Sequence, residues 1–225
     1  MTVLIRALLS VVLIGLPVAA TAHHLGSYTP RDNEISTNFK QLKFAIQAGR
    51  FDVAQRLFES GAVRKEMLAT APRLPPGLEG EVGASLRERQ GTAAERGLVI
   101  FFAALTRDLA LEAERQVRDV SVPAEVRAAA GRKFLEAIWR YYNLVDFAIS
   151  QYDPKAAVAV RLAFDEAEGL AKGAATPVAA NPCSGPRPAT RGAEVQNPER
   201  LRPPLARIAQ ALGAVVDSTT VRRPP

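Results

Sequence analysis

The stretch SVPAEVRAAAGRKFLEAIWRYYNLVDFAISQY, residues 121–152, carries the strongest structural signal in the chain. Ser121 and Pro123 form a helix start, because serine caps a helix with its side chain and proline at the first helical position gives up no backbone hydrogen bond. Beyond this start only a narrow stripe is polar, consisting of Arg132, Glu136, Arg140, Asn143 and Ser150, with Lys133 near its edge. A helix with so little polar surface must be covered on most sides. We therefore expect this helix at the centre of a helical bundle.

The segments around this helix are also helical in pattern. We expect two helices within 33–60 with a break at Gly49, a short helix at 63–70 and a long one over 84–119. Between them, prolines and glycines over 72–83 predict a loop that acts as a mobile flap. Asp153 and Pro154 start a last helix that runs to residue 171. Because no stretch alternates with period two, we predict an all-α fold, a single bundle of about five or six helices.

Residues 42–54, LKFAIQAGRFDVA, have a spacing of small, glycine, aromatic and alanine positions that resembles the helical hairpins of tetratricopeptide repeats. The resemblance covers about 20 residues, and no second copy follows at a fixed period. Such repeats need about three units to bury their faces. The resemblance therefore implies one helical hairpin here and does not extend to the whole chain.

The first 22 residues have the pattern of a signal peptide. Arg6 precedes an apolar run over 7–16, and Ala20-Thr21-Ala22 forms a cleavage site, with 18–20 as a competing site. The apolar run is shorter than the ~18 residues of a membrane-spanning helix, which favours cleavage over an uncleaved anchor. We therefore expect a periplasmic or secreted protein with a bundle domain over 23–173, a Pro/Arg-rich tail over 174–225 that contains a short helix at 205–216, and no transmembrane span.

The net charge of +6 is concentrated outside the expected bundle. The tail holds seven arginines and three acidic residues, so the bundle itself is nearly neutral. A neutral domain lacks the electrostatic footprint of a nucleic-acid-binding protein. Cys183 is the single cysteine, which excludes an intramolecular disulfide and multi-cysteine metal sites and predicts an exposed thiol in the tail.

Histidine usage excludes most common catalytic sites. The two histidines, His23 and His24, are adjacent at the expected mature terminus, so a Ser-His-Asp or Cys-His centre has no imidazole within the bundle. Carboxylate catalysis stays open, and its candidates are Asp108, Glu112, Asp146, Asp165, Glu166 and Glu168. Spacing predicts that Arg161 pairs with Asp165, and Lys172 with Glu168, as a solvated stripe.

Trp139, Tyr142 and Asp146 are the candidate binding residues within the bundle. The helical wheel places Asp146 at the edge of an apolar surface beside the two aromatic side chains. They would line a small polar pocket, or Asp146 would bond a buried tyrosine while the rings pack in the core; the pattern allows both.

Cleavage after Ala22 would make His23 the first residue, followed by His24. A terminal amine with imidazole and amide nitrogens suits Cu(II). This terminus resembles that of lytic polysaccharide monooxygenases and CopC-like copper carriers, where an amino-terminal histidine is a ligand. Those families have β-rich folds, so the resemblance covers only the position of the amino-terminal histidine. It implies copper as a cofactor and nothing about the fold.

These observations favour an exported, non-catalytic helical accessory or partner-binding protein of the bacterial cell envelope, whose partner is another envelope protein. The alternative is a periplasmic metal-handling protein, with copper at His23 and His24 or iron held by bundle carboxylates. A third hypothesis is an enzyme that uses acidic residues and tyrosines around Asp146.

Overall fold

The computed structural model describes residues 30–172 and 197–221, and within them the chain is helical without strands. These residues form eight α-helices and two short 3-10 helices, which confirms the all-α fold and raises the expected number of helices. Residues 1–29, with the expected signal peptide, His23 and His24, lie outside the described residues, as does Cys183. The α-helices are α1 Glu34–Gln47, α2 Phe51–Glu59, α3 Ala62–Ala69, α4 Leu78–Arg87, α5 Gly91–Arg118, α6 Ala124–Tyr152, α7 Pro154–Ala171 and α8 Arg202–Val221.

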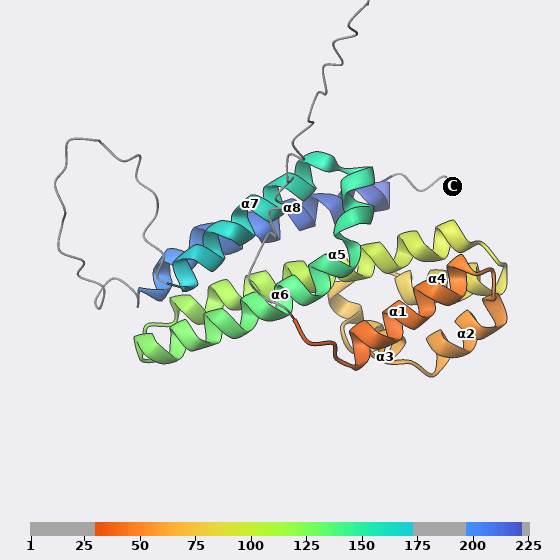
Figure 1. Cartoon of the computed structure of the whole chain (residues 1–225), viewed down its shortest axis with the longest axis horizontal. Helices are drawn as coiled ribbons and strands as arrows, with labels where there is room; N and C mark the ends of the chain where they lie inside the picture. Colours follow the sequence, from red (N-terminus) through yellow and green to blue (C-terminus); the bar gives the residue numbers. More distant parts are fainter. Residues whose placement is uncertain (1–29, 173–196, 222–225) are drawn as a thin grey trace, which may run out of the picture.

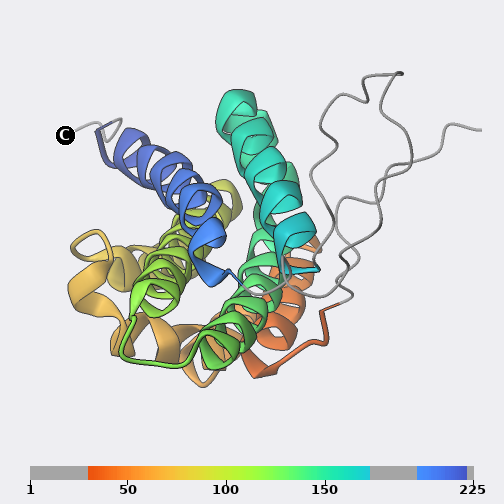
Figure 2. The same ribbon diagram turned by 90° about the vertical axis from the view of Figure 1, so that its left-hand side faces the viewer.

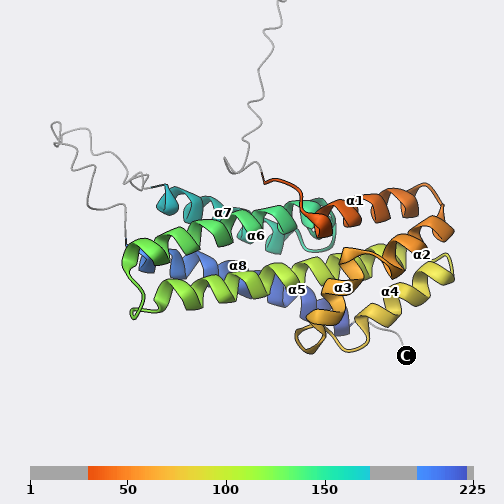
Figure 3. The ribbon, with the colours of Figure 1, turned by 90° about the horizontal axis from the view of Figure 1, so that it is seen from below.

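Helices α5 to α8 form an antiparallel four-helix arrangement along the length of the molecule (Figure 1). Helix α5 packs on α6 and α8, and α7 packs on the other side of the same two helices (Figures 2 and 3). The shorter helices α1 to α4 gather at one end, around the amino-terminal half of α5. One continuous apolar core joins both groups.

Helix α5, and not α6, is the centre of the bundle. Every residue from Gly97 to Thr106 is buried, because α1 and α4 cover α5 on one side while α6 and α8 cover the other. The expectation that the 121–152 helix is central was therefore wrong. Helix α6 leaves large apolar side chains at the surface, among them Phe147, which is 74% exposed. A narrow polar stripe does not require full coverage, since apolar atoms make up much of any protein surface.

The start of α6 also differs in detail from the expectation. The capping position is Pro123, and the hydroxyl of Ser121 donates to Asp119 instead of capping the helix. The expected start of α7 is confirmed, because the side chain of Asp153 accepts a hydrogen bond from the backbone N–H of Ala156. Helices α5 and α6 are thus joined by a short turn whose polar groups bond to one another.

A buried asparagine holds the amino-terminal helices together. The side chain of Asn38 donates to the carbonyl of Leu57 at 3.0 Å and accepts from the backbone N–H of Val63 at 2.9 Å. It therefore joins α1 to the end of α2 and the start of α3, which confirms the expected hairpin. Asn33 caps α1 and donates from its side-chain nitrogen to the hydroxyl of Tyr141 at 2.7 Å, which fixes α1 against α6.

The loop expected over 72–83 is largely helical. A 3-10 helix spans Ala71–Arg73, and α4 then begins at Leu78. Leu78, Val82 and Leu86 are buried at a spacing of four residues, and their burial offsets the low helix propensity of the glycines between them. The break before α5 falls at Arg89, whose φ of 58° is left-handed.

The carboxy-terminal helix belongs to the bundle. Helix α8 is longer than the expected 205–216 segment and follows a 3-10 helix, Pro198–Leu201. Its buried side chains join the common core, so the bundle continues beyond residue 173. These side chains are Leu205, Ile208, Ala209, Leu212, Val215 and Val216.

Candidate functional site

The three predicted binding residues Trp139, Tyr142 and Asp146 lie in the contact between α6 and α7. The ring of Trp139 stacks on Phe164 with 4.6 Å between centroids. The hydroxyl of Tyr142 donates to the carbonyl of Ala157 at 3.3 Å. These contacts are those of core packing, which is the alternative that the sequence left open.

Asp146 is engaged by an arginine from the neighbouring helix. The Arg161 guanidinium donates from Nε to Oδ1 at 2.9 Å and from Nη2 to Oδ2 at 2.5 Å. Burial, and then the neighbouring Asp146 carboxylate, raise the pKa of Tyr142 far above its ordinary value. The predicted pair of Arg161 with Asp165 is wrong, because the Arg161 guanidinium reaches across to Asp146 of α6.

The remaining candidate carboxylates serve mainly in ion pairs. Asp108 lies 2.8 Å from Arg107 and 3.5 Å from Arg73. Glu112 accepts hydrogen bonds from Arg115 and Gln116, which lower its pKa to about 2. Glu166 pairs with Arg207 of α8.

The predicted pair of Lys172 with Glu168 is confirmed at 2.6 Å. It is not part of a solvated stripe, however, because Glu168 is only 6% exposed. Beside it, burial and the charge of Glu168 raise the pKa of Asp165. Asp165 and Glu168 therefore interact along α7, and neither lines the groove described below.

The metal hypotheses have separate outcomes. Among the described residues, no group of three or more His, Cys, Asp or Glu side chains could hold a metal ion. His23 and His24 lie outside the described residues, and copper binding there stays a prediction.

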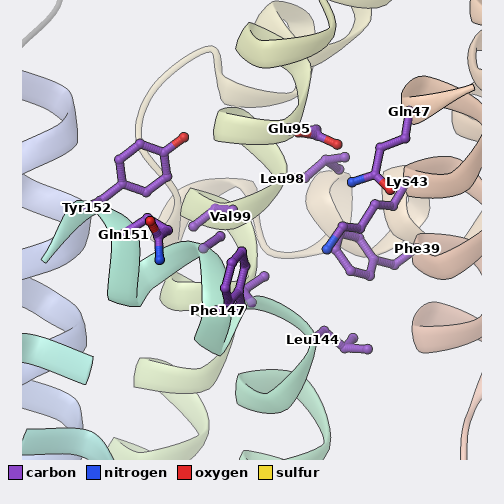
Figure 4. A pocket seen from close by; sticks show the side chains of 12 residues that line it. Phe39, Lys43, Gln47, Glu95, Leu98, Val99, Leu144, Phe147, Gln151 and Tyr152 are labelled. Carbon is purple, nitrogen blue, oxygen red and sulfur yellow. The ribbon is translucent and has the colours of Figure 1, made fainter. Parts of the chain in front are cut away.

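A groove between α1, α5 and α6 is the candidate functional site (Figure 4). Its cavity measures about 220 Å³, and its floor is mostly apolar. Helix α1 contributes one face, with Phe39, Lys43 and Gln47 spaced four residues apart. The other walls come from α5 and the last turns of α6: Glu95, Leu98, Val99, Leu144, Val145, Phe147, Ala148, Gln151 and Tyr152.

The amino-terminal contacts explain why a groove forms here. Phe39 packs edge-on against Phe102 of α5 at 4.6 Å, and Asn33 bonds Tyr141 of α6. Both contacts hold the first half of α1 close to α5 and α6. Lys43 and Gln47 lie further along the same face, where they line an opening instead of a closed contact.

A second cavity of about 330 Å³ adjoins the groove and shares Val99 and Tyr152 with it. It lies between α5, the α6–α7 turn and α8, where Arg96, Asp153 and Ser218 make its lining more polar. Tyr152, which is 54% exposed, therefore stands between the two hollows. Together with Phe147 it forms what we call the aromatic rim.

Sequence reasoning missed the groove. The i, i+4 series Phe39, Lys43 and Gln47 is visible in the sequence, and it indicates a shared helix face. Which helices that face would meet depends on how α1 packs against α5 and α6, over separations of about 50 to 100 residues. Periodicity within one helix contains no such information.

Comparison of the chain with protein families, with curated protein sequences and with solved structures finds no match in any of the three. Over the part of the chain that the structure describes, every helix is too short or too polar to cross a bilayer.

Proposed function

We propose that this chain is an exported, non-catalytic accessory protein of the bacterial cell envelope that binds another envelope protein through the aromatic rim of the groove. The observation that carries the proposal is the exposure of two large aromatic side chains, Phe147 and Tyr152, beside an apolar floor. Exposed apolar patches next to a concave surface are typical of interaction sites. Aromatic anchors in such patches contribute much of the binding energy in protein interfaces.

The chemistry of the remaining residues supports a binding role. Five of the six candidate carboxylates, all but Asp165, pair with arginine or lysine side chains, and the buried Tyr142 is bonded to a backbone carbonyl. An ion pair favours the charged form of a carboxylate, which suits a structural role better than that of a general acid. The envelope location rests on the leader pattern of residues 1–22.

Site-specific photo-crosslinking in the host cell tests this proposal. A benzophenone amino acid placed at Phe147 should yield one discrete adduct with an envelope protein. The same probe at Val126, which is 55% exposed on the same helix, is the matched control. It lies about 30 Å along α6 from Phe147 and should give no such adduct.

A second variant tests whether the Phe147 crosslink depends on the aromatic rim. Tyr152→Asp should abolish the Phe147 adduct while leaving the circular dichroism spectrum unchanged, because Tyr152 is more than half exposed. Equal crosslinking from Phe147 and Val126, or an adduct that survives Tyr152→Asp, would show that the rim is not the contact surface. Recovery of the chain in the cytoplasmic fraction with its leader uncleaved would contradict the location.

A further inference from the structure

Two charges of opposite sign inside the groove lack a partner. Lys43 of α1 is half-buried and forms no ion pair within the described ranges. Glu95 of α5 is also half-buried, and its Oε1 is shielded from water and accepts no hydrogen bond. A shielded polar atom without a partner costs free energy, and the cost is larger for a charged group.

The two charged side chains line one largely apolar cavity. Lys43 extends from α1 over Phe39, and Glu95 lies on the α5 side of the same cavity (Figure 4). They form no ion pair with each other. The apolar side chains of Leu98 and Leu144 line the same cavity. An occupant that satisfies both charges must therefore carry a cation, an anion and an apolar body.

We propose that this groove binds a compact zwitterion with an apolar side chain, the chemistry of a free apolar amino acid. Its carboxylate would pair with the Lys43 ammonium, and its own ammonium would donate to Glu95. The side chain would rest on the apolar floor. Charge-assisted hydrogen bonds of this kind are stronger than neutral ones.

The cavity argues against larger occupants. A volume of about 220 Å³ lies below the usual range for drug-sized ligands, which favours a small occupant. This ligand site is separate from the proposed protein contact, which uses the aromatic rim. Its recognition residues, Lys43 and Glu95, are not part of that rim.

Three probes with the same apolar body separate the two charge contacts. They are L-phenylalanine, phenethylamine, which lacks the carboxylate, and 3-phenylpropanoate, which lacks the ammonium. Isothermal titration calorimetry of the full processed chain should give a Kd for L-phenylalanine of about 1 mM or below. Each single-charge analogue should bind about tenfold more weakly or worse, because it leaves one groove charge unpaired. L-Leucine, isoamylamine and 4-methylpentanoate form a second series of the same design.

Two variants assign the contacts. In Lys43→Met the affinity for L-phenylalanine should fall to that of phenethylamine, whose own affinity stays unchanged. In Glu95→Gln the affinity should fall to that of 3-phenylpropanoate, which likewise stays unchanged. Lys65→Met, at an exposed position on α3, is the matched control and should bind all three probes like the parent chain.

Two results would overturn the proposal. One is that neither amino acid binds more tightly than its single-charge analogues. The other is a stability coupling between Lys43 and Glu95 in the ligand-free protein, measured by a double-mutant cycle, without binding of any probe; the two side chains would then simply pair with each other. Both results are independent of the crosslinking at Phe147, so a failure here is distinguishable from a failure of the proposed function.

Discussion

Tyr142 lies in the α6–α7 contact with its hydroxyl bonded to Ala157, and burial and Asp146 together raise its pKa. A raised folded pKa stabilises the fold fully below the unfolded value of 10.0, and this contribution is lost as pH rises towards the folded value. We therefore expect the unfolding free energy to fall above pH 10 by up to about 1.4 kcal/mol per pH unit from this residue. Urea titrations from pH 8 to 11 measure it.

The control for this pH dependence is Tyr142→Phe, which keeps the ring and removes the titrating group. The variant loses the bond to Ala157 at every pH, so its stability is lower but should decline less steeply above pH 10. The other tyrosines and the lysines titrate in both proteins and cancel in the comparison. Parallel pH profiles of the two proteins would contradict the assignment.

The pair of Asp146 and Arg161 provides a second test at the residue scale. Their side chains are 18% and 31% exposed, so removing one leaves the other partly desolvated beside Tyr142. We expect Arg161→Met to lower the unfolding free energy by about 1–3 kcal/mol. Arg56→Met breaks the largely exposed pair with Asp52 and should cost less than about 1 kcal/mol. Equal costs would mean that Asp146 is solvated and serves no role in the α6–α7 contact.

At the scale of elements, α4 shows how tertiary packing overrides local signals. Residues 72–83 are rich in proline and glycine, and their composition predicted a loop. The apolar spacing of Leu78, Val82 and Leu86 was also present in the sequence, but three positions with glycines between them are a weak signal. Their burial depends on α5, where Gly97 has no Cβ and Val82 of α4 can therefore pack closely. Helices with a clear cap, such as α1 and α7, were predictable because their signals are local.

Gly97→Ala tests this packing. A Cβ at Gly97 would lie 2.5 Å from Cγ2 of Val82, a buried and stiff side chain, so α4 must shift away from α5. We expect a loss of about 1–3 kcal/mol in unfolding free energy, from overpacking that exceeds the gain in helix propensity. Gly80→Ala in α4 has no heavy atom within 4 Å of its Cβ and should stabilise by about 0.5–1 kcal/mol. Chemical denaturation measures both, and a stabilising Gly97→Ala would show that α4 does not pack closely there.

At the scale of the whole molecule, long-range pairing decided what the sequence left unresolved. Periodicity identified the apolar faces of α5, α6 and α8 but not their partners, so the centre was assigned to α6 and the last helix was left in a tail. Helix α5 is central because two groups of helices pack on opposite sides of it. The groove depends on the same arrangement, since its three walls come from helices distant in sequence. The apolar pattern of a single helix therefore does not reveal where a binding site forms.

Because α8 shares the core of the bundle, the described helices should unfold as one cooperative unit. A chain that ends at residue 173 would expose the side of α5 and α7 that α8 covers, including the surface opposite Ile208 and Leu212, which are fully buried. Each buried leucine or isoleucine contributes about 2–5 kcal/mol, so loss of the whole helix exceeds the stability of a typical domain. We expect the shortened chain to lose its cooperative thermal transition and to bind a dye for exposed apolar surface, whereas the full chain shows a single transition by circular dichroism. Leu212→Ala keeps every helix and should only lower the midpoint. If the shortened chain melts as cooperatively and at the same temperature as the full chain, α8 is an appendage and the bundle ends at residue 173.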